Sequence, residues 1–221
     1  MKLALFDLDH TLIPIDSDYE WGVYTTARGW NDPAEFSHRN DAFYAHYKAG
    51  TLDIREYIRF ATLALCQHGA IQSEAVHADF MRVVVQKVIK PEALALVRQH
   101  QAAGDTVVII TATNEFVTRS IAQVFGVSDL MAVNLARDPV SGWFNGEIRG
   151  TPSFREGKVT RVQEWLTSRG LNWTDVQSTF YSDSINDLPL LEHVTHPVAT
   201  NPDERLRAIA KTRGWRILEL F

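Results

Sequence analysis

Three short apolar runs, each followed at once by polar residues, most constrain the fold of this chain. They lie at residues 2–6, 106–110 and 178–181. Helical patterns precede the second and third runs, over residues 92–103 and 159–168, and each pattern ends at a glycine. Short apolar runs that alternate with helices are typical of parallel strands covered on both faces. We therefore predict an α/β fold with a parallel sheet and right-handed crossovers.

Shorter elements complete this pattern. Three further strands are expected near residues 131–136, 197–199 and 215–220. Residues 138–148 alternate apolar side chains with Asp, Pro, Gly and Asn, which is typical of a small hairpin. The sheet is thus expected to contain more strands than the three strongest runs.

The stretch from about residue 15 to residue 85 has a different character. It is helical in pattern, rich in aromatic residues and without a convincing strand. Residues 16–82 carry ten acidic and six basic residues, so they hold −4 of the chain's net charge of −5. Because this stretch separates the first strand from the others, we predict a helical insertion over residues 16–85. Residues 1–15 and 86–221 then form the core.

Composition excludes several classes of partner. A net charge of −5 over 221 residues disfavours general binding to nucleic acid or to an anionic membrane. No apolar run approaches the roughly 20 residues that a membrane span needs. The single cysteine, Cys66, cannot form an internal disulfide and fits a reducing compartment. We expect a cytoplasmic protein, monomeric or homodimeric, whose partner is a small molecule.

Carboxylates follow two of the three strongest strands. Asp7 and Asp9 come directly after the first, and Asp183 and Asp187 follow the third. Ligands of open parallel sheets bind beyond the carboxyl ends of the strands, so we expect these side chains to share one cleft. Four carboxylates so close would raise one another's pKa unless a cation neutralised them. Magnesium, which prefers oxygen ligands, is the natural candidate.

Four motifs in this order resemble those of the haloacid dehalogenase-like phosphohydrolases. They are Asp7-Leu8-Asp9-His10-Thr11, Thr111 after the second strand, Lys158 at the start of a helix, and Asp183-Ser184-Ile185-Asn186-Asp187. The resemblance covers essentially the whole chain. It implies a Rossmann-like core with an inserted helical cap of the C1 type, as in the subgroup that contains the phosphoserine phosphatases.

The resemblance also implies catalytic roles. Asp7 would attack phosphorus and become an aspartyl phosphate. Asp9 would protonate the leaving oxygen and then deprotonate the attacking water. The Thr111 hydroxyl, with the backbone N–H groups of Ala112 and Thr113, would hold the phosphoryl oxygens. Lys158 would neutralise charge on the nucleophile and on the transferred group.

The same resemblance implies a Mg²⁺ site. Asp7, the backbone carbonyl of Asp9, and Asp183 would hold the ion, and Asp187 would be a further ligand or a partner of the ligands. Asn186 would orient either Asp183 or the phosphate. Simpler interpretations stay open for two residues: Asp187 as an acid favoured by a helix dipole, and Lys158 as a surface lysine.

The insertion is expected to select the substrate. By resemblance to the phosphoserine phosphatases, Asp16 takes the place of an acid that binds substrate, whereas Ala61 stands where they carry a carboxylate-pairing arginine. An acidic, aromatic insertion suits a cationic substrate without a carboxylate. The acids expected to bind an ammonium of the substrate are Asp16, Asp18 and Glu20. The aromatic residues expected to stack on a flat or cationic ring of the substrate are Trp21, Tyr24 or Tyr44.

L-Histidinol phosphate, with an ammonium and an imidazole, meets this description, and the pattern also resembles bacterial histidinol-phosphatases of this subgroup. Three alternatives stay open: a phosphatase of phosphoserine or another small phosphomonoester, a phosphotransferase or mutase on the same scaffold, and a catalytically silent binding protein.

Overall fold

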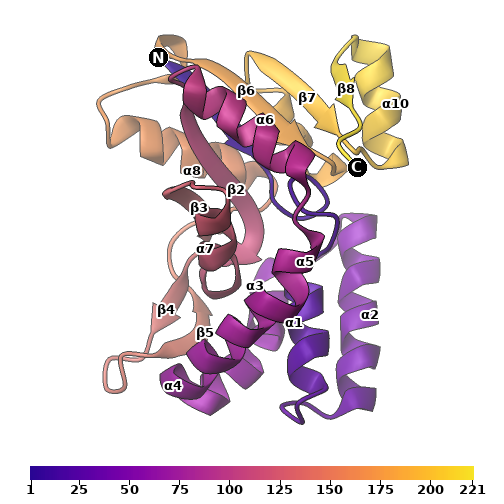
Figure 1. Cartoon of the computed structure of the whole chain (residues 1–221), viewed down its shortest axis with the longest axis vertical. Helices are drawn as coiled ribbons and strands as arrows, with labels where there is room; N and C mark the ends of the chain where they lie inside the picture. Colours follow the sequence, from indigo (N-terminus) through magenta and orange to yellow (C-terminus); the bar gives the residue numbers. More distant parts are fainter.

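A six-stranded parallel sheet forms the centre of the computed structural model, which describes residues 1–221 (Figure 1). The strand order is β3-β2-β1-β6-β7-β8, and every neighbouring pair is parallel. The strands are β1 (Lys2–Phe6), β2 (Thr106–Asn114), β3 (Asp129–Val133), β6 (Gln177–Ser182), β7 (His196–Thr200) and β8 (Arg216–Leu218). The predicted parallel sheet is confirmed. β1 lies between β2 and β6, so the three strongest apolar runs are neighbours.

Helices cover both faces of the sheet because successive side chains of a strand point to opposite sides. Ala4 and Phe6 pack on the side of α6 (Pro91–Ala102) and α7 (Glu115–Val124). Leu3 and Leu5 pack on the opposite side. That side is covered by α8 (Glu156–Thr167), α9 (Leu188–Leu191) and α10 (Glu204–Arg213). This double covering explains why residues 3–6 of β1 and 107–110 of β2 are apolar on both faces.

The single strand predicted near residues 131–136 is wrong. The chain leaves the main sheet after β3, and Asn134 lies between β3 and the next strand, β4 (Leu135–Arg137). The Asn134 carbonyl accepts a hydrogen bond from the Arg149 N–H at 2.8 Å, so the backbone turns at this point. β4 then pairs with β5 (Phe144–Ile148) as an antiparallel hairpin. The predicted hairpin is confirmed, but its first strand begins earlier than expected.

All secondary-structure elements between β1 and α6 are helices. These are α1 (Ser17–Thr26), α2 (Pro33–Ala49), α3 (Ile54–Ala61), α4 (Leu63–Phe80), a π-helical turn (Met81–Val85) and α5 (Gln86–Val88). The first three begin at Asp16, Asp32 and Asp53, whose carboxylates accept hydrogen bonds from first-turn N–H groups. We call residues 16–85 the helical insertion, and α5 connects it to α6. Figure 1 shows it as a separate layer beside the sheet, with the β4–β5 hairpin against α3 and α4.

No helix of the structure combines the length and the hydropathy needed to cross a membrane.

Gly157 permits a close approach that positions the start of α8. A Cβ atom on this residue would lie 2.1 Å from the carbonyl oxygen of Pro152. We predict that Gly157→Ala lowers the free energy of unfolding by about 1–3 kcal/mol, although alanine ordinarily favours a helix. Urea unfolding measures this difference. Thr160→Ala, at an exposed position of the same helix, is the control, and equal stability of Gly157→Ala and the unsubstituted protein would contradict the prediction.

Candidate active site

A cavity of about 420 Å³ lies where the carboxyl ends of β1, β2 and β6 face the helical insertion. Twelve of its lining residues, here the core group, come from the strand ends and adjacent turns of the core: Asp7, Asp9, His10, Thr111, Ala112, Thr113, Phe154, Lys158, Asp183, Ser184, Asn186 and Asp187. The insertion supplies most of the remaining wall. The structure thus brings together nearly all of the polar residues singled out in the three motif-bearing strands and α8.

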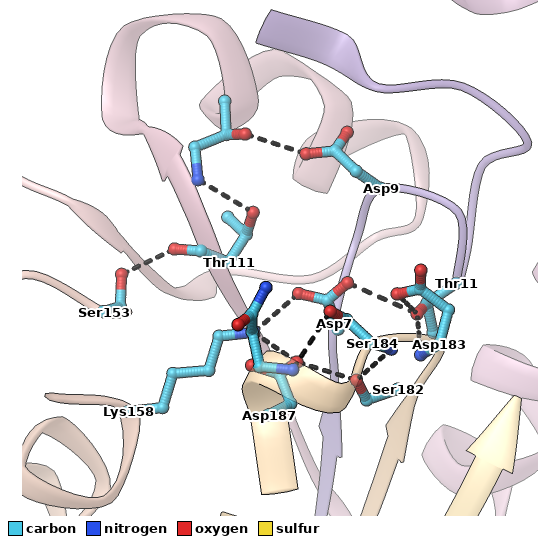
Figure 2. A network of polar contacts seen from close by, with 12 residues as sticks. Asp7, Asp9, Thr11, Thr111, Ser153, Lys158, Ser182, Asp183, Ser184 and Asp187 are labelled. Atoms are coloured by element: carbon cyan, nitrogen blue, oxygen red, sulfur yellow. Dashed lines mark hydrogen bonds and ion pairs between the residues drawn. The ribbon is translucent and has the colours of Figure 1, made fainter. Parts of the chain in front are cut away.

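Lys158 is the central cation of this site. It is 2% exposed, and its Nζ atom lies 2.7 Å from Asp7 Oδ1 and 2.7 Å from Asp187 Oδ2 (Figure 2). The Ser182 hydroxyl donates to the same Asp187 oxygen at 2.7 Å. Burial lowers the pKa of Lys158, but attraction to Asp187 and Asp7 outweighs this effect and the net shift is upward. The ammonium therefore stays charged and is held by two carboxylates rather than facing solvent.

Thr11 connects the first and fourth motifs, and sequence analysis assigned it no role. Its Oγ1 atom lies 3.3 Å from Asp7 Oδ2 and 3.1 Å from Asp183 Oδ1, and it accepts a hydrogen bond from the Asp183 N–H at 3.1 Å (Figure 2). Thr11 is completely buried. Its place within the first motif was the only sequence signal, and a hydroxyl five residues after a strand has many other uses.

Asp9 is held apart from the lysine. Its Oδ1 atom accepts from the backbone N–H of Ser17 at 2.8 Å, and its Oδ2 atom accepts from the Thr113 hydroxyl at 2.8 Å. Burial, followed by repulsion from Asp16, raises the pKa of Asp9 well above its usual value. This environment favours the protonated acid. The Thr113 N–H donates to Thr111 Oγ1 at 3.1 Å, which leaves the Thr111 proton free to point elsewhere.

The charges of the core group leave an uncompensated negative charge. The group holds the carboxylates of Asp7, Asp183 and Asp187 with the single ammonium of Lys158, which contacts Asp7 and Asp187. Burial raises the pKa of Asp7 to about 6 against the opposing effect of Lys158. Burial, with repulsion from Asp7 and Asp187, raises the pKa of Asp183 well above its usual value. A divalent cation beside Asp7 and Asp183 would remove this repulsion, so the donor set fits Mg²⁺.

Side chains alone do not complete such a cation site. No group of three His, Cys, Asp or Glu side chains is arranged to hold a metal ion. Both carboxylate oxygens of Asp9 already accept hydrogen bonds, and the Oδ2 atom of Asp187 is occupied by Lys158 and Ser182. A cation here would need backbone carbonyl and water oxygens as well, which is usual for Mg²⁺.

Of the three acids predicted to bind substrate, only Asp16 lines the cavity. Its Oδ1 atom also caps α1. Asp18 and Glu20 do not line the cavity. Asp18 is buried and accepts a hydrogen bond from Asn114 Nδ2 at 3.0 Å. Burial and repulsion from Asp16 raise the pKa of Asp18 to about 7.

Of the three aromatic residues predicted to contact the substrate, only Tyr44 lines the cavity. Trp21 is 2% exposed and lies in the hydrophobic core, and Tyr24 donates to Asp79, so neither lines the cavity. Tyr44 does line it. The other wall residues of α2 and α3 were not predicted from the sequence; they are Asn40, Phe43, Tyr47, Lys48, Ile54 and Tyr57. The spacing 40, 43, 44 and 47, which places residues on one face of a helix, was the available signal.

No arginine of the insertion lines the cavity. Ala61 lies away from it, and Arg59 forms a bidentate ion pair with Glu147 of β5, at 2.8 and 3.1 Å. The cavity's one arginine, Arg205, comes from α10 and donates to the Lys48 carbonyl at 3.1 Å. The insertion therefore presents no guanidinium for a substrate carboxylate.

The family model for the haloacid dehalogenase-like hydrolases matches residues 4–192. The chain belongs to this family. It is 41% identical over 218 residues to a histidinol-phosphatase of Neisseria meningitidis serogroup C, with 98% of each chain covered. It is 30% identical to the phosphoserine phosphatase SerB1 of Mycobacterium tuberculosis, covering 97% of this chain and 69% of that protein.

Two solved structures share the fold. A Bordetella pertussis Tohama I protein of unknown function superposes with a TM-score of 0.91 and 48% identity, over 100% of this chain and 99% of that one. A substrate-bound phosphoserine phosphatase superposes with a TM-score of 0.69 at 17% identity, over 99% and 92% of the two chains. Together with the family match and the similar curated phosphatases, this fold makes the protein a phosphatase.

Asp18 tests the electrostatics of the site. Because burial raises its pKa above the unfolded value, its contribution to stability is fully present below about pH 4 and is lost as the pH rises through about 7. Replacement by the neutral isostere in Asp18→Asn is thus predicted to raise the free energy of unfolding at pH 8 by about 1–3 kcal/mol relative to the unsubstituted protein, with little effect at pH 4. Urea titrations at the two pH values measure this, and a pH-independent difference would contradict it.

Proposed function

We propose that this phosphatase hydrolyses a small phosphomonoester through an aspartyl phosphate on Asp7, with Mg²⁺ as cofactor and L-histidinol phosphate as substrate. The observation that carries the proposal is the Asp7 carboxylate, held between the Lys158 ammonium and the Thr11 hydroxyl at the floor of the cavity. This arrangement orients an ionised carboxylate toward the space where a phosphate ester would enter. Lys158 neutralises charge that develops during transfer.

The proposed reaction has two displacements. An Asp7 carboxylate oxygen attacks phosphorus in line, the ester P–O bond breaks, and Asp9 transfers its proton to the leaving alkoxide. Asp9, now ionised, then takes a proton from water as the water oxygen attacks phosphorus and the bond to Asp7 breaks. Inorganic phosphate leaves and Asp7 is regenerated. The raised pKa of Asp9 supports this exchange of roles, since it keeps the acid protonated before the first step.

Other residues of the core group would bind the phosphoryl oxygens. Thr111, whose hydroxyl proton is free, and the N–H groups of Ala112 and Thr113 lie at the end of β2, where this binding is proposed. Mg²⁺ would be held by the carboxylates of Asp7 and Asp183 and the Asp9 carbonyl, and it would supply charge neutralisation between phosphate and nucleophile. Asp187 is proposed to position Lys158.

The insertion is proposed to act as a cap over this site, with residues 16–85 as the cap and residues 1–15 and 86–221 as the core. Backbone carbonyls at the end of α2 accept hydrogen bonds from core side chains. Asn186 donates to the Tyr47 carbonyl at 3.2 Å, and Arg155 donates to the Gly50 carbonyl at 2.7 Å. We propose that these contacts hold the cap closed over the site, and that closure keeps water from the reacting phosphate.

Three observations support a cationic substrate without a carboxylate. Asp16 lines the cavity near Asp9 and suits an ammonium group. The insertion wall is largely aromatic, and it contributes no arginine to the cavity. A substrate carboxylate at the insertion wall would therefore lose its hydration without gaining a bidentate partner there. The cavity's guanidinium, that of Arg205, belongs to α10 and donates to the Lys48 carbonyl. The 41% identical Neisseria relative is a histidinol-phosphatase.

A phosphate-release screen over histidinol phosphate, phosphoserine, and sugar and nucleotide monophosphates tests the proposal. With Mg²⁺ present we expect the highest kcat/KM for histidinol phosphate. We expect a chelator to abolish turnover, and Asp7→Asn to lower kcat by at least about 1,000-fold. Asp41→Asn, an exposed aspartate of α2, is the control. Higher kcat/KM for phosphoserine would contradict the substrate, and substantial turnover by a folded Asp7→Asn would contradict the nucleophile.

A further inference from the structure

Only one residue of the 17-residue helix α2 is buried, and it is polar. This residue is Asn40, which is 6% exposed. Its carboxamide lines the cavity and has no hydrogen-bond partner within the protein. Neither amide atom is among the fully buried, unpartnered atoms of the protein, so the amide faces the cavity. A ligand that covers it must supply hydrogen bonds or leave it unpaired, which is unfavourable. Packing of α2 therefore does not account for an asparagine here.

The position of Asn40 places it far from the phosphate end of the cavity. Tyr47, on the same face of α2, donates from its hydroxyl to Ser184 at 3.1 Å and so marks the end near the core group. Asn40 is seven residues earlier, a displacement of about 10 Å along the helix axis. This separation suits the end of a small leaving group opposite its phosphate.

Aromatic side chains surround the space between these two ends. Phe43 and Tyr44 of α2 and Tyr57 of α3 line the cavity. The rings of Phe43 and Tyr57 pack edge to face, with their centroids 5.5 Å apart. Such walls bind a flat ring by contact with its faces but offer little to its polar edge. The carboxamide of Asn40 lines the same part of the wall and can form hydrogen bonds with such an edge.

We infer that Asn40 is a specificity-determining residue, whose carboxamide binds the nitrogen edge of a heteroaromatic ring at the end of the leaving group. This inference rests on the proposed function and deepens it. A carboxamide carries both donors and an acceptor, and an imidazole edge carries nitrogen atoms that complement them. Asp16, near Asp9, would bind an ammonium closer to the phosphate. The substrate class is a monophosphate of an amino alcohol that bears a nitrogen heterocycle.

The experiment compares two substrates of the same shape. Histidinol phosphate and phenylalaninol phosphate share the phosphate, the ammonium and a flat ring, but only the first has ring nitrogens. We expect the unsubstituted protein to prefer histidinol phosphate by about ten- to a hundred-fold in kcat/KM, because phenyl leaves the buried amide unpaired. Asn40→Leu is expected to abolish this preference.

Thermal stability separates recognition from a structural role. Since Asn40 makes no hydrogen bond within the protein, we expect Asn40→Leu to unfold at the same temperature as the unsubstituted protein or higher. The smaller Asn40→Ala is a second variant with the same expected loss of preference, should leucine not fit. Ser37→Leu, at an exposed position of α2, is the control and is expected to keep the preference.

The outcomes distinguish this inference from the proposed function. Folded Asn40→Leu and Asn40→Ala variants that keep the preference would overturn the role of Asn40 and leave histidinol phosphate as the substrate. A marked loss of stability in both variants would assign Asn40 a structural role instead. If the unsubstituted protein hydrolysed aryl phosphate but not histidinol phosphate, the proposed substrate would fail, and the assignment of Asn40 would fail with it.

Discussion

The ion triad of Lys158, Asp7 and Asp187 is the interaction on which the site depends. A lysine that is 2% exposed requires partners for its charge, and two carboxylates at 2.7 Å supply them. These partners come from the ends of β1 and from the turn after β6, whereas the lysine comes from α8. The triad therefore joins three separate segments. Gly157 makes the arrangement possible, because only a residue without a Cβ fits beside Pro152.

The two halves of the cavity have different physical characters. The core group concentrates negative charge around one ammonium, which suits a cation and a phosphate. The insertion contributes aromatic rings and only two charged residues, Asp16 and Lys48. Chemistry at the phosphate is thus separated from recognition of the leaving group. Each half contains a polar group that fold stability alone does not explain. In the core group this is Asp183, whose pKa is raised by burial and by repulsion from two neighbouring carboxylates, and in the insertion it is the amide of Asn40.

The sheet and the convergence of polar residues at its edge were predictable because each rests on a local pattern. Apolar runs followed by Asp7 or Asp183 identify strand ends, and parallel strands bring their ends together. The break at Asn134 was not predictable, since residues 131–136 are continuously apolar apart from that residue. Pairing of β4 with β5, rather than with β2, is decided by tertiary contacts with α3 and α4.

Side-chain direction within the insertion was harder to predict than the insertion itself. Asp16 and Asp18 are two residues apart at the start of α1, yet one lines the cavity and the other is buried against Asn114. Positions two apart on a helix face different directions, but which face meets the core depends on how the helices pack. The aromatic composition likewise did not distinguish Trp21 in the core from Tyr44 in the wall.

The central claim is that Asp7 becomes covalently phosphorylated, and the most direct measurement is mass spectrometry of peptides from acid-quenched enzyme taken during turnover. We expect one phosphoryl group on the N-terminal peptide, at Asp7, which hydroxylamine removes as it does other acyl phosphates. Phosphate on a different residue, or no phosphorylated peptide during rapid turnover, would contradict the claim.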